Sequence, residues 1–271
     1  MTSDDKDQPL QVSNSQLFTK TSELEQAKSP AQNPQQDDEL AFLSPPQAEG
    51  EIGRLGNYAV HRKLGQGGMG LVLEAEDLLL KRRVALKVMK PEIATKESQR
   101  LRFIREAQAA AAVEHDHICP IFQVGLENGV PYIAMPFLKG DPLDAYFKMR
   151  KPLPMYEVVQ IGREVAEGLA AAHRAGLVHR DIKPGNIWLE QLADGRTRVR
   201  ILDFGLARSV KEDVGLTQAG AIIGTPAYMA PEQARSKPLD HRCDLFSLGV
   251  MLYELSVGKR PFSGSVILFR Y

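Results

Sequence analysis

Cysteine is nearly absent from the 271 residues: only Cys119 and Cys243 occur, far apart and without a C-x-x-C pair. Such a chain is neither a disulfide-stapled secreted scaffold nor a cysteine-ligated zinc domain, and we expect two reduced, buried thiols. No run of eighteen apolar residues occurs, so no membrane-spanning helix and no membrane contact are expected of this chain. The opening residues, M-T-S-D-D, are acidic and polar, unlike a secretory signal, and a cytoplasmic protein is therefore predicted.

An excess of charge of one sign is also lacking, because 34 basic residues balance 34 acidic ones. A neutral chain has no bulk electrostatic attraction for nucleic acid, which we do not expect as a partner. The rest of the composition, 43% hydrophobic and 25% charged, is that of an ordinary globular protein.

Aromatic residues are scarce in residues 1–56, which are rich in Gln, Ser, Pro and Asp. The same segment contains ten acidic residues and only four basic ones. A polar, acidic segment of this kind cannot bury enough apolar area to offset the entropy lost on ordering. We therefore predict that residues 1–56 are disordered and that the folded domain covers residues 57–271.

The most informative stretch that is present, residues 179–186, reads H-R-D-I-K-P-G-N. Asp181 can accept a proton from a hydroxyl, Lys183 can neutralise a phosphoryl group, and Asn186 can offer an oxygen to Mg²⁺. Pro184 disfavours helix at the residue before it, so a loop is predicted here. H-R-D followed by K-P-x-N is far more specific than H-R-D alone.

A glycine-rich stretch, residues 65–72, reads G-Q-G-G-M-G-L-V. Glycines leave room for backbone N–H groups to approach phosphate oxygens. A dinucleotide-binding fold would need a helix directly afterwards and an acidic residue about 20 positions later. Residues 71–76 are strand-like instead, and residues 84–91 contain no acid. The loop is therefore predicted to join two antiparallel strands and to cover phosphates as a flap.

A lysine stands in the next predicted strand, residues 83–89. Its alternation places Val84, Leu86 and Val88 on one face and Ala85 and Lys87 on the other. An ammonium group on a mostly apolar strand needs a partner, because burying it alone is costly. Residues 96–113 form a good helix with Glu106 on its apolar side, and we expect Glu106 to pair with Lys87. The alternative is a lysine that extends along the edge of the sheet into water.

Further elements follow in order. Residues 118–124 and 130–135 are predicted strands, residues 143–149 and 155–176 predicted helices, and residues 187–202 a hairpin with its turn at Asp194. The hairpin leads into D-F-G at 203–205, so Asp203 falls 22 residues after Asp181 and the two carboxylates can converge. Asp203 is expected to bind Mg²⁺, and Phe204 is expected to pack inward.

In this order the motifs resemble those of the eukaryotic-like serine/threonine protein kinases, in the form common in bacteria. The resemblance covers about residues 58–264 and includes G-T-P-A-Y-M-A-P-E at 224–232. It implies an α+β, bilobal fold: an N-lobe at 57–135 with a five-stranded antiparallel sheet and one helix, a hinge at 136–140, and a mostly helical C-lobe at 141–271.

The resemblance also implies roles for individual residues. Asp181, Lys183 and Asn186 become the catalytic set, and Asn186 and Asp203 the metal ligands. Met135 is the gatekeeper, and Trp188 is the floor of an adenine pocket. The residues expected around ATP are Leu64, Gly65, Gln66, Gly67, Gly68, Met69, Gly70, Leu71, Val72, Ala85, Lys87, Glu106, Met135, Pro136, Leu138 and Trp188.

The span between D-F-G and A-P-E resembles an activation segment. Thr217 is the expected regulatory phosphosite, which Arg180 could pair with once it is phosphorylated, and Thr225 is a second candidate closer to the catalytic residues. Asp244 is expected to brace the catalytic loop from below. The expected cofactors are ATP and Mg²⁺, with Mn²⁺ as the alternative ion, and the expected partners are proteins with a serine or threonine, with association of two kinase domains left open.

One departure from the family pattern is the short C-terminal part. The family continues for several more helices past residues 259–262, and those helices normally pair an arginine with the carboxylate that matches Glu232. We expect that carboxylate to be unpaired and the helix at 244–255 to show an apolar flank. Two alternatives to a working kinase stay open. One is a truncated, inactive nucleotide-binding scaffold. The other is a small-molecule phosphotransferase, which residues 224–232 disfavour because that stretch is suited to holding a peptide.

Overall fold

The computed structural model describes residues 39–68, 70–204 and 226–262. The predicted site residues Met69, Thr217 and Thr225 lie outside these ranges.

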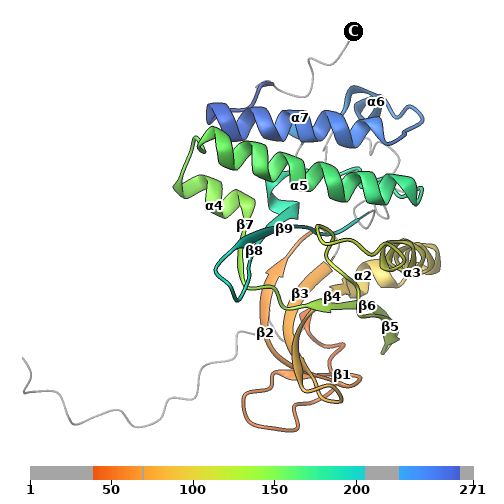
Figure 1. Cartoon of the computed structure of the whole chain (residues 1–271). Coiled ribbons are helices and arrows are strands. Elements are labelled where there is room, and N and C mark those ends of the chain that lie inside the picture. The colour runs from red at the N-terminus through yellow and green to blue at the C-terminus, as the bar shows by residue number, and fades with distance from the viewer. Residues whose placement is uncertain (1–38, 69, 205–225, 263–271) are drawn as a thin grey trace, which may run out of the picture. The chain divides into compact units, whose positions relative to one another are not determined.

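The first part of the described chain is an antiparallel sheet of six strands in the order β1-β2-β3-β4-β6-β5 (Figure 1). The strands are β1 (Gly53–Leu55), β2 (Tyr58–Gln66), β3 (Gly70–Asp77), β4 (Arg82–Met89), β5 (Gln123–Glu127) and β6 (Val130–Pro136). Between β4 and β5 run α2 (Pro91–Ala94) and α3 (Glu97–Ala111). The predicted sheet and helix are therefore present, with one strand and one short helix more than expected.

The predicted alternation of β4 is confirmed. Val84, Leu86 and Val88 are fully buried in one hydrophobic cluster, together with Leu71 and Leu73 of β3. Lys87 points to the other face, where its side chain keeps 12% of its exposure. The same face of the sheet carries the glycine-rich turn, because Gly65 pairs with Val72 and Val72 with Lys87 across the strands.

Residues 39–56 correct the predicted boundary, because they belong to the fold. Phe42 is 7% exposed and lies in the same cluster as the sheet core, and its carbonyl accepts a hydrogen bond of 2.8 Å from Asn128 Nδ2. Lys63 binds Glu39 at 2.5 Å, and β1 pairs with β2 along its whole length. Composition averaged over 56 residues hid this short apolar stretch, since the polar residues before it dominate the average.

The predicted strand at 118–124 is also corrected, because β5 begins only at Gln123. Pro120 has no N–H and cannot continue a ladder. The segment before β5 instead makes a single parallel bridge from Ile118 to Ile201, with Cys119 N donating to Ile201 O at 2.9 Å. This bridge ties the chain after α3 to the strand that precedes Asp203.

The second part of the described chain is mostly helical (Figure 1). It contains α4 (Leu143–Met149), α5 (Met155–Arg174), α6 (Pro231–Ala234) and α7 (Arg242–Val257), and a small sheet of β7 (Gly140–Pro142), β8 (Ile187–Gln191) and β9 (Thr197–Ile201). Two 3₁₀ turns lie at Pro184–Asn186 and Pro226–Tyr228. Helices α5 and α7 pack closely, because a Cβ built on Gly162 would lie 2.9 Å from Leu252.

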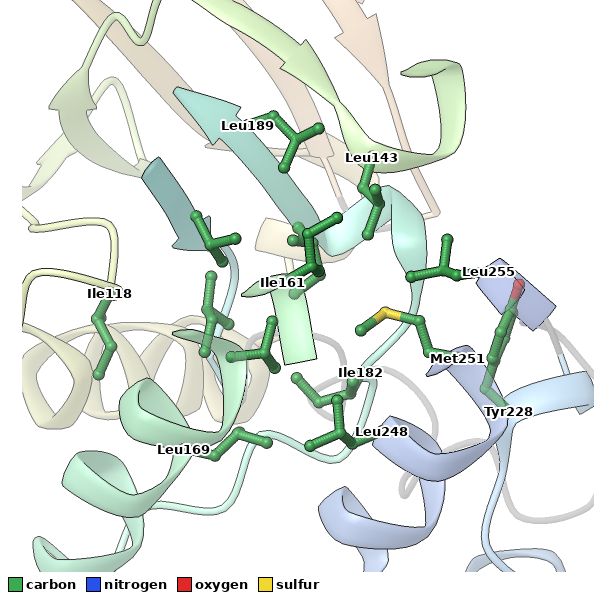
Figure 2. Packing of buried hydrophobic residues seen from close by; sticks show 14 of the residues in the cluster. Ile118, Leu143, Ile161, Leu169, Ile182, Leu189, Tyr228, Leu248, Met251 and Leu255 are labelled. Carbon is green, nitrogen blue, oxygen red and sulfur yellow. The ribbon is translucent and has the colours of Figure 1, made fainter. Parts of the chain in front are cut away.

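Buried aliphatic side chains fill the space between these helices and the small sheet. Figure 2 shows Ile161 and Leu169 of α5 with Leu248, Met251 and Leu255 of α7 in one cluster. Ile182, from the catalytic stretch, is fully buried in the same cluster. The catalytic loop is thus anchored by its own apolar residue in the helical core.

One flank of α7 remains in contact with solvent, as predicted. Leu245, Tyr253 and Val257 are 43–49% exposed, whereas Leu248, Met251 and Leu255 are buried. Glu232 forms no ion pair with any residue that the structure describes. None of the helices in the described residues is both long and apolar enough to span a bilayer.

Gly70 provides a test of the glycine-rich turn. A Cβ built on Gly70 would lie 2.3 Å from the backbone oxygen of Val88, whereas one on Gly67 would meet nothing within 4 Å. We expect Gly70→Ala to lower the free energy of unfolding by about 1–3 kcal/mol, because the backbone of β4 must shift. Gly67→Ala serves as the control and should leave chemical denaturation nearly unchanged; equal losses for both variants would contradict this packing.

The two thiols provide a second test. Burial raises the pKa of Cys119 to about 12 and that of Cys243 to about 12. The reactive thiolate is then a minute fraction near neutral pH, and both thiols are covered by the fold. We expect a thiol reagent to label neither cysteine in the folded protein and both in denaturant. Rapid labelling of the native chain would show that one of these sites opens.

Candidate active site

His179 fixes the start of the catalytic loop. Its ring is fully buried, and its Nδ1 accepts a hydrogen bond of 3.2 Å from Asp181 N. The proton therefore sits on Nε2, which donates to Leu202 O at 2.8 Å. The edge of the ring also packs on Phe204, with 4.8 Å between the ring centroids. One histidine thus joins the loop to the segment that carries Asp203, and Phe204 packs inward as predicted.

Three predicted catalytic residues converge within this loop. Lys183 Nζ donates to Asp181 Oδ2 at 2.6 Å, and Asn186 Nδ2 donates to the same oxygen at 3.0 Å. Asn186 Nδ2 also donates to Asp181 O at 2.7 Å, so the amide nitrogen is fully used. The amide oxygen of Asn186 takes no part in these bonds and can act as an acceptor. Asp181 keeps 22% of its side-chain exposure, so an incoming hydroxyl can reach it.

Asp244 of α7 holds the loop from below, as predicted. It is fully buried, and its carboxylate accepts hydrogen bonds from His179 N at 2.8 Å and from Arg180 N at 2.6 Å. His173 Nε2, at the end of α5, lies 2.8 Å from the same carboxylate. His173 is therefore a structural residue that supports Asp244.

Arg180 adopts a left-handed backbone conformation with φ of 69°. This conformation is costly for a residue with a side chain and persists where the surroundings impose it. Asp244 binds its N–H, and Gln233 Nε2 donates to its carbonyl oxygen at 2.9 Å. Gln233 was missed at the sequence level, because nothing in the sequence indicates a contact between residues 53 positions apart.

Lys87 has a different partner from the one predicted. Its Nζ lies 2.7 Å from Asp203 Oδ1, whereas Glu106 Oε1 accepts a hydrogen bond from Arg102 Nε at 3.2 Å. Arg102 stands one helical turn before Glu106 on α3, where an oppositely charged neighbour competes for the carboxylate. Asp203 has a left-handed backbone with φ of 62°, which turns its side chain towards β4. The expected Lys87–Glu106 pair is therefore replaced by Lys87–Asp203 in this structure.

The remaining residues predicted around ATP occupy neighbouring strands. The turn after β2 closes with a hydrogen bond of 2.8 Å from Gly67 N to Gly70 O. Ala85 pairs with Met135 and Val84 with Pro136, so β4 lies beside the end of β6, where the segment predicted as the hinge begins. Leu64 and Gln66 are exposed on β2, and Leu71 is buried on β3. Leu138 lies between β6 and β7 and is half-buried.

Trp188 connects the small sheet to the same segment. Its Nε1 donates to Lys139 O at 3.2 Å, and its backbone pairs with Pro142 on one side and Arg200 on the other. Leu189, the next residue, pairs with Asp141, and the two neighbours on β8 point to opposite faces. Trp188 therefore lies beside the hinge, where the predicted adenine floor would be.

The oxygen atoms available at this site suit a hard divalent cation. Asn186 offers an amide oxygen and Asp203 a carboxylate, the ligand types that Mg²⁺ prefers. The described ranges contain no group of three His, Cys, Asp or Glu side chains that could hold a metal ion.

Comparisons with known proteins identify the family of this chain. The family described as "Protein kinase domain" matches residues 58–267. Serine/threonine-protein kinase pkn3 of Myxococcus xanthus is 41% identical over 76% of this chain and 38% of its own length, and PknL of Mycobacterium tuberculosis is 41% identical over 78% and 52%. The crystal structure of the Mycobacterium tuberculosis PknI kinase domain is similar with a TM-score of 0.63 at 31% identity, covering 83% of this chain and 84% of that one. The chain spans less than two thirds of the curated relatives named here.

Proposed function

Because the chain belongs to the protein kinase family, we propose that it transfers the γ-phosphoryl group of ATP to serine or threonine hydroxyls of protein substrates. The observation that carries the proposal is the convergence of Lys183 and Asn186 on one oxygen of Asp181. The similarity to named serine/threonine kinases at about 40% identity supports the choice of hydroxyl. The α+β fold inferred from the motifs is confirmed by the solved kinase domain.

The residues of this chain supply positioning and charge. Asp181 accepts the proton of the substrate hydroxyl, and Lys183 donates a charged hydrogen bond to the transferring group. Lys87 orients the phosphates from β4, and the turn at Gly65–Gly70 covers them with backbone N–H groups. Met135, Pro136, Leu138 and Trp188 surround the adenine in this proposal.

A Mg²⁺ ion, or Mn²⁺ as the alternative, would neutralise charge on the phosphates, and Asn186 and Asp203 are the residues that would hold it. Asn186 suits this role because its amide nitrogen is already committed to Asp181. Asp203 has one carboxylate oxygen against Lys87 and a second one to offer. Since ATP and reduced thiols belong to the cytoplasm, we place the reaction there.

Arg180 supports regulation through the activation segment. Its Nε is buried and has no hydrogen-bond partner among the described residues. An unsatisfied buried guanidinium nitrogen would gain a charged hydrogen bond from a phosphate nearby. Phosphorylation of Thr217 would supply one, and Thr225 is the second candidate. Association of two kinase domains remains an expectation that sedimentation of the chain at several concentrations tests.

The function is tested by incubating the purified chain with Mg·ATP, followed by intact-mass measurement and peptide mapping. We expect a gain of phosphate that maps to Thr217 or its neighbours, and transfer to a generic basic protein but not to amino-sugars. Transfer to the sugars alone would favour a small-molecule phosphotransferase. A folded chain that binds ATP but transfers phosphate to nothing would favour the inactive scaffold.

Trp188 gives a separate readout of nucleotide binding, because it is the only tryptophan. If Trp188 lies under the adenine, saturating ATP should change the intrinsic fluorescence of the native chain. Trp188→Phe removes the signal and serves as the control. Unchanged fluorescence at a saturating nucleotide concentration would place the adenine elsewhere.

A further inference from the structure

The small sheet has a hollow on the face opposite to Trp188. Asp141 and Leu189 line this hollow together with Tyr146 of α4 and Gln160 and Glu164 of α5, and its volume is about 260 Å³. Because alternate residues of β8 point to opposite faces, Leu189 faces this hollow while Trp188 faces the hinge. The hollow is therefore distinct from the proposed ATP site.

The lining of the hollow is acidic. Asp141, Glu157 and Glu164 contribute three carboxylates, and no lysine or arginine is among the lining residues. Glu164 is 6% exposed and accepts hydrogen bonds from two neutral donors, Gln160 Nε2 at 3.0 Å and Val199 N at 2.9 Å, and His117 Nδ1 lies 3.6 Å from its Oε2.

The other two carboxylates differ in how far they are neutralised. Glu157 is offset by Arg150, whose Nη2 lies 3.0 Å from its carboxylate. Asp141 is exposed and forms no ion pair with the residues that the structure describes. A negative field with an unpaired carboxylate at its edge attracts a cation.

The size of the hollow limits what it can hold. Small-molecule sites usually measure about 300–1,000 Å³, so a hollow of about 260 Å³ suits a single side chain better than a cofactor. An arginine or lysine side chain brings the complementary charge and an apolar stem that can lie along Leu189 and Ile161.

An apolar patch adjoins the hollow on α5. Met155 is 64% exposed, Tyr156 70% and Val159 61%, and these side chains line a second hollow together with Gln160, which also lines the first, and Arg163, which pairs with Glu167 at 3.8 Å. Contiguous exposed apolar side chains beside a charged pocket are typical of surfaces that bind another protein.

We propose that this acidic hollow and the adjoining apolar patch bind an extended segment of a protein substrate, which places a basic side chain in the hollow and apolar side chains on Met155, Tyr156 and Val159. The occupant follows from charge complementarity and from the size of the hollow. That the bound protein is a substrate rests on the proposed function, whereas the existence of a binding surface does not. Binding here would hold a substrate on the chain without occupying the phosphate-transfer site.

The test is a direct binding measurement, independent of catalysis. The probe is a short fluorescein-labelled peptide of Gly and Ser with two arginines near one end and two leucines near the other, prepared in both orders. Fluorescence anisotropy with the full chain should show saturable binding that weakens as salt rises, because exposed charge pairs are screened. Replacing the arginines by glutamate, or the leucines by serine, should abolish it.

Two variants locate the binding on the protein. Asp141→Lys and Val159→Glu alter exposed side chains. Each should lower the affinity for the peptide by about tenfold, as expected for a reversed or newly buried charge in an interface. The matched controls are Glu49→Lys and Leu79→Glu, which make the same changes at exposed positions elsewhere and should change the affinity less than about twofold.

Several results would overturn the proposal. They are absence of saturable binding in both probe orders, unchanged affinity of Asp141→Lys and Val159→Glu, and equal losses in the controls. Displacement of the probe by a peptide of residues 1–38 would assign the surface to the chain's own segment. Self-association that Val159→Glu abolishes would assign it to a second copy. Loss of phosphate transfer with intact peptide binding would count against the proposed function alone.

Discussion

Replacing Asp181 with asparagine is expected to lower the rate of phosphate transfer by about 10²–10⁴-fold, the usual contribution of a positioned base. Asp181 Oδ2 accepts hydrogen bonds from both Lys183 and Asn186, so its negative charge also holds these two side chains in place. Asparagine keeps the size and one acceptor oxygen but cannot take up a proton. The fold and the affinity for ATP should therefore persist.

The measurement is the mass gain of the chain and the initial rate of transfer to a basic protein, with ATP affinity taken from Trp188 fluorescence. Asp194→Asn is a suitable control, because Asp194 is an aspartate in the exposed hairpin turn and, among the residues that the structure describes, binds only Arg196. A rate for Asp181→Asn within about threefold of the native chain would remove Asp181 from the role of base. A parallel loss of ATP binding would indicate a structural role instead.

Replacing Asp244 with alanine is expected to lower the free energy of unfolding by about 3–5 kcal/mol, the usual cost of breaking a buried charged network. The carboxylate binds two backbone N–H groups and His173, and all of these would lose their acceptor in a site from which water is excluded. Because the same bonds hold Arg180 in its left-handed conformation, the catalytic loop should also lose its geometry.

Chemical denaturation measures the first effect, and the transfer rate at a temperature where the variant is still folded measures the second. Asp244→Asn keeps one acceptor oxygen and should fall between the alanine variant and the native chain. Asp240→Ala is the control, since Asp240 is a half-exposed aspartate just before α7 that binds the guanidinium of Arg242 at 2.7 Å and its backbone N–H at 2.9 Å. If Asp244→Ala lowered the free energy of unfolding no more than Asp240→Ala, the hydrogen bonds of Asp244 to the catalytic loop would contribute little to stability.

Much of the site could be predicted from the sequence, because its chemistry is concentrated in short motifs. Residues 179–186 and 203–204 form short motifs whose members are close in the sequence. Spacing within the first motif was therefore enough to predict that Asp181, Lys183 and Asn186 lie together. The alternation of β4 likewise gave the direction of Lys87. Asp244 was placed under the loop only through the resemblance, and the structure agrees.

The errors concern contacts that depend on competition between distant segments. Lys87 could reach either Glu106 or Asp203, and the choice depends on the left-handed turn at Asp203 and on Arg102 beside Glu106. Neither effect is visible as a spacing. The prediction that residues 39–56 are disordered was wrong for another reason. Burial of Phe42 stabilises this segment, and that burial depends on the neighbouring sheet, which the local composition does not reveal.

Phe42 has a practical consequence for where the folding unit starts. A fragment cut at Tyr58, where the kinase motifs begin, would strip the β1 strand from the sheet and open the site that Phe42 fills beside Leu55 and Val60. Apolar side chains and the unpaired edge of β2 would then face water, and exposed strand edges promote aggregation. Preparations that begin near Glu39 should therefore stay dispersed at concentrations where those that begin at Tyr58 precipitate.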